Sequence, residues 1–215
     1  MLKQIYLLAY NTLCAVGWCV VLMTVSKELY ETGDVALAAS SATPMVTALQ
    51  AIACMEFVHS VVGLVSGSPL NAFFQLVGRN VIHFGFIYPK NTANLYVVSL
   101  YFAWSMAEVI RYPFYGLSVI NSCPGPLLWL RYSAFIVLYP IGILSEIATT
   151  LSVLPETTGM DKYVGEGNLK FIIYPYFVYA YCYAAPVLFR YLLKARRKNL
   201  GGEVEVSKKT RKKKQ

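Results

Sequence analysis

Charged side chains are scarce in this chain of 215 residues. They make up 14% of the sequence, and 57% of the residues are hydrophobic. Soluble domains carry roughly a quarter charged residues, and the mean hydropathy here is +0.50. An ordinary soluble domain is therefore excluded, and the composition predicts a membrane protein.

Histidine and cysteine are also too few for several kinds of site. The sequence has two histidines, His59 and His83, which excludes a membrane desaturase or hydroxylase because such iron centres need many His ligands. The five cysteines form no CxxC pair, so neither a zinc site nor a disulfide framework is expected. No glycine-rich phosphate or dinucleotide loop is present either.

Positive charge is concentrated at one end of the chain. The formal net charge is +8, but residues 190–215 hold 11 Lys/Arg and 2 Asp/Glu, a balance of +9 that leaves −1 for the rest. The body therefore offers no basic face, and no nucleic-acid partner is expected. The sequence predicts a membrane domain at residues 1–193 and a basic tail at residues 194–215.

Several apolar stretches approach the roughly 20 residues that a spanning helix needs. The third is the weakest, because Arg79 and His83 interrupt a short run. The pattern predicts an all-α polytopic membrane protein with six transmembrane helices, at about residues 5–25, 45–65, 73–88, 95–117, 127–153 and 171–193. Clusters of turn-forming residues place loops at 66–69, 89–94, 121–126 and 155–168.

The basic tail predicts the orientation of the chain. Under the positive-inside rule the C-terminus is cytosolic, and six spans put the N-terminus on the same side. Lys212 and Lys213 stand fourth and third from the end, a pattern that resembles the dilysine retrieval signal of endoplasmic reticulum membrane proteins. The alternative is a polybasic segment that touches anionic lipid. The first apolar run is expected to be a retained signal anchor, because residues 27–34 separate it from any cleavage-like site.

Three glutamates lie inside the expected spans. A charged, unpaired side chain at mid-bilayer costs roughly 2.5–3.5 kcal/mol. Glu108 has Arg111 one turn away, so an ion pair is expected, whether it serves packing or function. Glu56 is expected to pair with His59 on its own helix or with Arg79 on the next span.

Glu146 has no basic residue within one helical turn. On a straight helix it shares a face with Tyr132, Phe135, Tyr139 and Gly142. Pro140 favours a kink, and Gly142 leaves a notch between its neighbours, so a slot is expected with the Tyr139 phenol at one end and the Glu146 carboxyl at the other. Such a pair suits proton transfer at two adjacent carbons, although an aromatic stripe at helical spacing also occurs in ordinary core packing.

Long blocks of sequence resemble one enzyme family. Leu130-Arg131-Tyr132-Ser133-Ala134-Phe135 and Leu138-Tyr139-Pro140-Ile141-Gly142-Ile143-Leu144-Ser145-Glu146 closely resemble the signature of the membrane 3-hydroxyacyl-CoA dehydratases, also called protein-tyrosine-phosphatase-like proteins. Further matching blocks, in order, are Tyr10-Asn11, Gly17-Trp18, Glu56-Phe57-Val58-His59, Gln75 to Arg79, Trp104 to Glu108 and Ile110-Arg111-Tyr112. The resemblance covers about residues 6–193.

The resemblance implies dehydration of a long- or very-long-chain (3R)-3-hydroxyacyl-CoA to the trans-2-enoyl-CoA, the third step of fatty acid elongation. It implies residence in the endoplasmic reticulum membrane, no cofactor or metal, and partnership with the condensing enzyme, the ketoacyl reductase and the enoyl reductase of the cycle. Tyr139 and Glu146 are the expected catalytic pair. Supporting or substrate-positioning roles are expected for Glu56, Gln75, Arg79, Glu108, Arg111, Arg131 and Gly142.

The sequence leaves open which catalytic residue is the acid and which the base, and it leaves two competing functions. We favour Tyr139 as the base and Glu146 as the acid, with Arg111 or Arg131 stabilising a phenolate, but the roles are exchangeable. The competing interpretations are a non-catalytic scaffold of the elongase assembly and a proton-coupled carrier. Phosphatase activity is not expected, because the family's His-Cys-x-x-Gly string reads His59-Ser60-Val61-Val62-Gly63 here.

Overall fold

The structure is a computed structural model that describes residues 1–65, 69–153, 175 and 177–212, without the side chains of residue 71 and residues 202–212. The expected loop at 155–168, the start of the sixth expected span and Lys213 lie outside the described residues. Every element of the described part is helical. The elements are α1 Leu2–Thr32, α2 Val35–Val61, α3 Pro69–Ile82, η1 His83–Ile87, η2 Tyr88–Lys90, α4 Leu95–Val119, α5 Gly125–Arg131, α6 Phe135–Val153, η3 Val178–Ala184 and α9 Ala185–Lys212.

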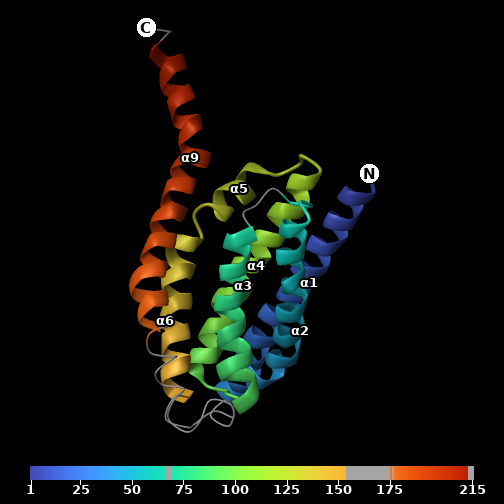
Figure 1. Ribbon diagram of the computed structural model, residues 1–215, viewed down its shortest axis with the longest axis vertical. Coiled ribbons are helices and arrows are strands. Elements are labelled where there is room, and N and C mark those ends of the chain that lie inside the picture. The colour runs from blue at the N-terminus through green and yellow to red at the C-terminus, as the bar shows by residue number, and fades with distance from the viewer. Residues whose placement is uncertain (66–68, 154–174, 176, 213–215) are drawn as a thin grey trace.

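The all-α expectation is confirmed, and three described helices are long and apolar enough to cross a membrane. These are α1, α2 and the run Gly125–Val153. In Figure 1 the helical segments form one bundle, and each runs in the opposite direction to the one before it. In chain order the segments are α1, α2, α3–η1, α4, α5–α6 and η3–α9. The N-terminus and the exit of α9 lie at the same end of that bundle.

The first hairpin differs from its expected bounds. Gly33 ends α1 in a left-handed conformation (φ +66°), and the Asp34 carboxylate caps α2 by accepting hydrogen bonds from the backbone N–H groups of Ala36 and Leu37. The charged stretch 27–34 therefore belongs largely to α1, and α2 begins ten residues before the expected start at 45. Gly33 and Asp34 determine where α1 ends and α2 begins, and an average of hydropathy over a window of residues does not detect such capping residues.

The fifth expected span is not one straight helix. A turn at residues 132–134 separates α5 from α6, and Figure 1 shows α5 lying across the end of the bundle. Tyr132 is therefore outside α6, and its ring packs edge-on against Phe114 of α4. Tyr139 lies about 6 Å along α6 from its start and Glu146 about 16 Å, at 1.5 Å per residue.

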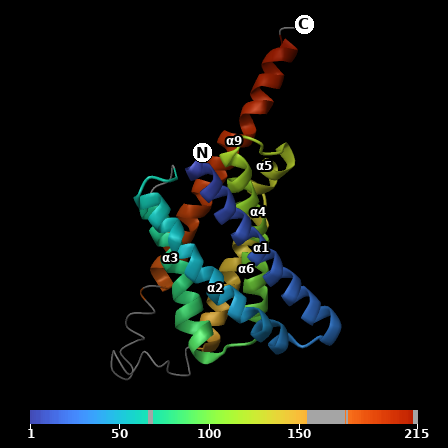
Figure 2. The same ribbon diagram turned by 90° about the vertical axis from the view of Figure 1, so that its right-hand side faces the viewer.

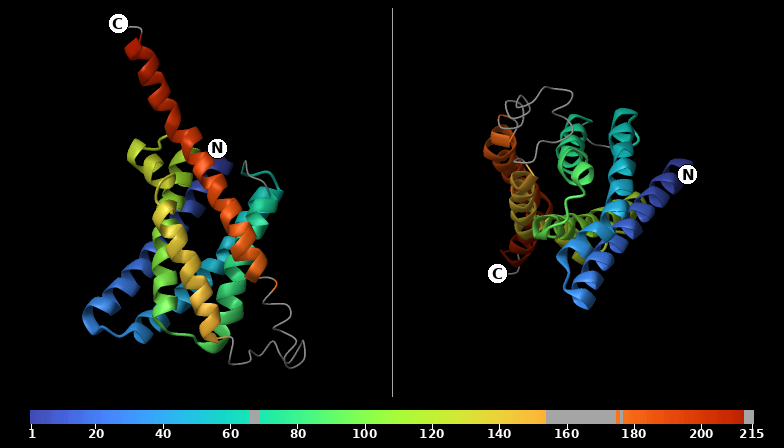
Figure 3. Two further views of the ribbon diagram at one scale, coloured as in Figure 1. Left: turned by 90° about the vertical axis from the view of Figure 1, so that its left-hand side faces the viewer. Right: turned by 90° about the horizontal axis from the view of Figure 1, so that it is seen from below.

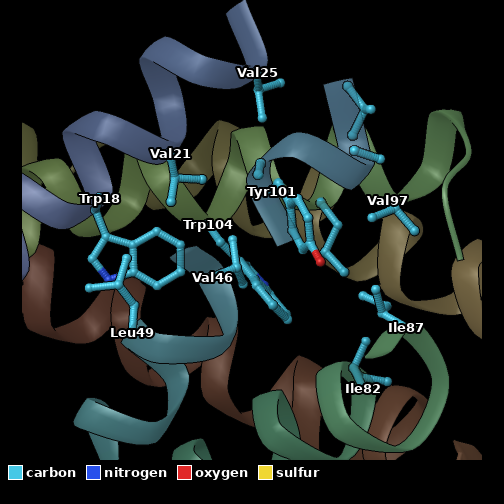
Figure 4. Packing of buried hydrophobic residues seen from close by; sticks show 14 of the residues in the cluster. Trp18, Val21, Val25, Val46, Leu49, Ile82, Ile87, Val97, Tyr101 and Trp104 are labelled. Atoms are coloured by element: carbon cyan, nitrogen blue, oxygen red, sulfur yellow. The ribbon is translucent and has the colours of Figure 1, made fainter. Parts of the chain in front are cut away.

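Helix α4 is the centre of the bundle, since it packs against α1, α2 and α6. Seen along the bundle axis, α1–α2 and α6–α9 lie on opposite sides of it (Figure 3, right), and α1 crosses the bundle obliquely (Figure 2). The buried cluster between α1, α2, α3–η1 and α4 includes Trp18, Val21, Val25, Val46, Leu49, Ile82, Ile87, Val97, Tyr101 and Trp104 (Figure 4).

One glycine sets the spacing of α1 and α2. A Cβ on Gly17 would lie 2.6 Å from Cδ2 of Leu49, which is closer than side-chain contacts allow. Glycine at this position therefore lets the two helices pack closely without displacing the Leu49 side chain. This approach brings the neighbouring Trp18 into the bundle, where it is 1% exposed.

Helix α9 continues past the boundary expected at 193/194 and runs to Lys212. It projects beyond the other helices in Figure 1. The division into a membrane domain and a tail remains a prediction.

Candidate functional site

Glu146 is held by neutral hydrogen-bond donors. The indole N–H of Trp104, on α4, donates to Oε1 over 3.3 Å, and the hydroxyl of Tyr181, on η3, donates to Oε2 over 3.0 Å. Within the described part of the chain, Glu146 makes no ion pair. Glu146 has no basic residue within one turn of its own helix. Its carboxyl group is instead held by two uncharged groups from two other elements.

Tyr139 contacts the same neighbouring segment. Its hydroxyl donates to the backbone carbonyl of Ala185 over 3.0 Å, and its ring stacks on Phe189 with centroids 5.7 Å apart. Ala185 follows Tyr181 by four residues, so Tyr139 and Glu146 contact successive turns of η3–α9. The two expected catalytic residues thus face one shared wall.

Open space lies beside Gly142, on the helix face that carries these two side chains. Gly142 is buried, yet a Cβ built on it would meet no atom within 4 Å. Gly142 stands three residues after Tyr139 and four before Glu146, which places it on the same helix face. We call this space, bounded by Tyr139, Gly142, Glu146 and the η3–α9 wall, the slot.

The sequence analysis did not identify the face of η3–α9 that contacts Tyr139 and Glu146, which we call the η3–α9 wall. Its contact residues recur every four positions, at Phe177, Tyr181, Ala185 and Phe189. Phe177 packs on Tyr181, and Phe189 packs on both Phe135 and Tyr139. This four-residue repeat inside a Tyr- and Phe-rich run is the signal that indicates a single buried face.

A second polar cluster joins three helices beside the slot. Arg111 on α4 donates two hydrogen bonds to the Glu56 carboxylate of α2, over 2.8 and 2.7 Å, and its Nε donates to Oε2 of Glu108 over 2.5 Å. Arg79 of α3 pairs with the other Glu108 oxygen, and Tyr112 donates to Glu56. We call Glu56, Arg79, Glu108 and Arg111 the charge network. Its two carboxylates and two guanidinium groups are neutral in sum.

The charge network confirms one expected pair and corrects another. The ion pair between Glu108 and Arg111 is present. The expectation that Glu56 pairs with His59 or Arg79 is wrong, because Glu56 faces Arg111, whose planar fork matches a carboxylate with two charge-assisted hydrogen bonds. His59 instead exchanges a 2.7 Å hydrogen bond with the hydroxyl of Tyr6 on α1.

Arg79 and Trp104 connect the charge network to the slot. The guanidinium carbon of Arg79 lies 5.2 Å from the ring centroid of Trp18 and 4.7 Å from that of Trp104. Figure 4 shows both tryptophans in the buried cluster. Since the Trp104 N–H also donates to Glu146, one side chain touches a member of the charge network and a wall of the slot. The sequence resemblance included Trp104 without giving it a role.

Two of the expected supporting residues lie outside both clusters. Gln75 is exposed on α3, one turn before Arg79. Arg131 ends α5, where it donates to the Tyr115 hydroxyl over 3.2 Å and lies over the rings of Phe114, Tyr115 and Tyr132. Among the described contacts of Tyr139 there is neither Arg111 nor Arg131, so the cation expected beside the phenol is not found there.

The chain is similar to known proteins along most of its length. The family model described as "Protein tyrosine phosphatase-like protein, PTPLA" matches residues 50–202. The very-long-chain (3R)-3-hydroxyacyl-CoA dehydratase PASTICCINO 2A of Oryza sativa subsp. japonica is 35% identical over 209 residues, covering 92% of this chain and 94% of that protein. The probable very-long-chain (3R)-3-hydroxyacyl-CoA dehydratase of Schizosaccharomyces pombe is 32% identical over 200 residues, covering 92% of this chain and 93% of that protein.

A mammalian relative is similar over more of this chain. Very-long-chain (3R)-3-hydroxyacyl-CoA dehydratase 1 of Canis lupus familiaris is 31% identical over 221 residues, covering 97% of this chain and 87% of that protein. No solved structure matches the chain. The relatives therefore match it nearly end to end, including the parts that form the slot and the charge network.

Proposed function

The chain belongs to the protein tyrosine phosphatase-like family, and from this premise we propose that it dehydrates a long- or very-long-chain (3R)-3-hydroxyacyl-CoA to the trans-2-enoyl-CoA. This reaction is the third step of the fatty acid elongation cycle, and the protein is then a hydro-lyase. The observation that carries the proposal within the molecule is the slot. It sets a phenol and a carboxyl on the helix face beside open space in an apolar bundle.

The hydrogen bonds favour Glu146 as the base and Tyr139 as the acid, the reverse of the roles favoured from the sequence. A carbonyl oxygen only accepts, so the Tyr139 hydroxyl that reaches Ala185 carries a proton it can donate. Glu146 accepts at both oxygens, from the Trp104 indole at Oε1 and from the Tyr181 hydroxyl at Oε2, which suits the carboxylate form that a base requires. We therefore assign Glu146 as the base and Tyr139 as the acid, in place of the assignment favoured by sequence, which required a cation at Tyr139.

The proposed elimination balances without a cofactor. Glu146 takes the proton from the α-carbon, and the electrons of that C–H bond form the double bond to the β-carbon. The bond from the β-carbon to its hydroxyl breaks, and the Tyr139 proton converts the leaving hydroxide to water. Return of the proton from Glu146 to the phenolate, directly or through that water, restores both groups.

The position of the slot suits a substrate with a water-soluble head and an apolar tail. Because α6 starts only after the turn at 132–134, Tyr139 and Glu146 lie about 6 and 16 Å along α6 from its first residue, at the end of the helix next to α5. A pantetheine arm entering at this end has a shorter distance to cover than one continuous helix from residue 127 would impose. The acyl chain then lies among the apolar helices.

We place the protein in the endoplasmic reticulum membrane with six spans and both termini cytosolic. The alternating direction of the helical segments and the common location of the N-terminus and the α9 exit support this arrangement. Lys212 and Lys213 are the proposed retrieval signal, and the other elongation-cycle enzymes are the proposed partners. Protease protection of an N-terminal tag in sealed microsomes would contradict the orientation.

The alternative is a non-catalytic scaffold of the elongase assembly. A scaffold needs no phenol and carboxyl beside open space, so the slot favours the enzyme. A proton-coupled carrier is disfavoured because two of its candidate carboxyls, Glu56 and Glu108, are engaged by guanidinium groups. Phosphatase activity is disfavoured by Ser60, which stands where a thiol nucleophile is required.

Turnover of purified protein in detergent tests the proposal. With (3R)-3-hydroxyoctadecanoyl-CoA, wild type should release the trans-2-enoyl-CoA, and Tyr139→Phe should lower kcat by about 10²–10⁴ by removing the acid. Tyr179→Phe is the matched control, because Tyr179 is exposed on η3. Folded wild type that forms no enoyl product would favour the scaffold.

A further inference from the structure

Arg79 differs from Arg111 in how its donors are used. All three nitrogens of the Arg111 guanidinium donate to carboxylate oxygens of Glu56 or Glu108. Arg79 uses only Nη1, which pairs with Glu108. Its Nε and Nη2 are buried and have no hydrogen-bond partner among the described residues.

The two free nitrogens form one edge of the guanidinium plane. The N–H bonds on Nε and Nη2 point the same way, as a fork that can hold one or two acceptor oxygens. Leaving a charged donor buried and unsatisfied costs upwards of about 1–3 kcal/mol. The edge therefore fits an oxygen acceptor that arrives with a ligand, and best an oxygen that carries developing negative charge.

The surroundings hold this edge in place. The rings of Trp18 and Trp104 lie 5.2 and 4.7 Å from the guanidinium carbon, and Glu108 fixes the opposite side. Trp104 contacts both groups, because its ring lies beside the Arg79 guanidinium and its N–H donates to Glu146. Arg79 and the group assigned as the base are therefore neighbours of the same tryptophan side chain.

We propose that Arg79 binds the thioester carbonyl oxygen of the acyl-CoA substrate and stabilises the charge that forms on it, an inference that rests on the proposed dehydratase function. When Glu146 removes the α-proton, the electrons of the C–H bond delocalise onto the thioester oxygen, giving an enolate. They return as the carbonyl re-forms and the β C–O bond breaks, and Tyr139 protonates the leaving hydroxide to water. No further reactant is needed.

The atoms of the substrate match this arrangement. The thioester carbonyl is bonded to the α-carbon, and the hydroxyl is on the next carbon along. Arg79, Glu146 and Tyr139 would then serve the carbonyl oxygen, the α-proton and the β-hydroxyl in that order. A preorganised donor aimed at a forming oxyanion in a dry site is worth about 10²–10³ in kcat.

The first experiment separates the free edge from the ion pair. Arg79→Lys keeps a cation for Glu108 but loses the fork, and Arg190→Lys, at an exposed position on α9, is its matched control. We expect Arg79→Lys to lower kcat for (3R)-3-hydroxyoctadecanoyl-CoA by about 10²–10³ with a smaller change in KM. A wild-type kcat in Arg79→Lys overturns the proposal.

The second experiment uses binding and does not depend on turnover. Wild type should bind trans-2-octadecenoyl-CoA at least about tenfold more tightly than its thioether isostere, which lacks the carbonyl oxygen, and Arg79→Lys should lose most of this preference. A purely structural arginine would weaken both ligands equally. Equal binding of the two ligands by wild type overturns the inference even if the variant fails to fold. Absence of any enoyl product from wild type overturns the proposed function instead.

Discussion

Glu108 and Glu146 are both carboxyls inside the helical bundle, yet their partners are opposite in kind. Glu108 receives guanidinium groups from Arg79 and Arg111, whereas Glu146 receives an indole N–H and a phenol. A carboxylate between two cations is fixed as an anion. A carboxyl between neutral donors is free to exchange a proton, so only the second suits acid–base chemistry.

The two regions also differ in what they join. The charge network ties α2, α3 and α4 together through charged groups whose exposure is at most 27%. Removing one member of such a set leaves an uncompensated charge, at a cost of about 3–5 kcal/mol. The slot ties α6 to α4 and η3–α9 with hydrogen bonds from uncharged donors, each worth about 0.5–3 kcal/mol. We therefore expect the ion pairs of the charge network to govern stability and the slot to govern proton transfer. The free edge of Arg79, and not its ion pair with Glu108, is the part of the network proposed to act on substrate.

The largest expected effect is on turnover. Glu146→Gln keeps the shape and most of the hydrogen bonding but removes the base, so kcat should fall by about 10³ or more. The midpoint of thermal unfolding in detergent should stay within a few degrees of wild type, because only neutral contacts change. Enoyl-CoA formation and unfolding are measured on the same preparation.

Glu31→Gln is the matched control for this change, since Glu31 is exposed at the end of α1 and pairs only with Lys27 among the described residues. It should leave both readouts unchanged. A Glu146→Gln protein that keeps more than about a tenth of wild-type kcat would remove Glu146 from the catalytic pair.

The same substitution at the other carboxyl should move the other readout. Glu108→Gln leaves Arg79 and Arg111 beside each other with one carboxylate fewer, and it should lower the free energy of unfolding by about 3–5 kcal/mol. The yield of folded protein and its thermal midpoint report this loss. An unfolding midpoint equal to that of wild type would mean that the network contributes little to stability, and the contrast between the regions would fail.

Sequence reasoning reached much of this arrangement because membrane helices carry local signals. Apolar runs located the helical segments, and the one-turn spacing of Glu108 and Arg111 predicted their ion pair. The seven-residue spacing of Tyr139 and Glu146 predicted that both would share a helix face. These features depend on neighbours along one helix, which periodicity reports directly.

Contacts between distant segments explain what sequence missed. Glu146 and Tyr181 are 35 residues apart, and no spacing within either helix indicates that they meet. One span was expected from about 127 to 153 with a kink at Pro140, and the turn at 132–134 was not foreseen; there Arg196 of α9 donates to the Ser133 hydroxyl over 3.2 Å. Which helix faces which is decided by packing of the whole bundle, and that information is tertiary.

A smaller effect should separate stability from activity at the slot itself. Gly142→Ala adds a methyl group where a Cβ meets no atom, so it should stabilise α6 by about 0.5–1 kcal/mol. The methyl group also occupies the space meant for substrate, and kcat/KM should fall by about tenfold. Opposite shifts of the unfolding midpoint and kcat/KM identify the slot as a binding space.

Gly201→Ala on α9 is the control for helix propensity, because a Cβ there also meets no atom. It should match the stability change without the loss of activity. If Gly142→Ala turns over substrate as well as wild type does, substrate does not lie against Gly142.

The smallest expected effect concerns the wall that sequence missed. Tyr181→Phe removes one neutral hydrogen bond to Glu146 and keeps the ring that packs on Phe177. The loss of about 0.5–1.5 kcal/mol of orientation energy should lower kcat by roughly threefold to tenfold. Tyr183→Phe, exposed two residues further along η3, is the control. Because Tyr181 acts through Glu146, the effect should vanish in a Glu146→Gln background, where the base is already lost. Equal proportional losses in both backgrounds would show that Tyr181 acts on something other than Glu146.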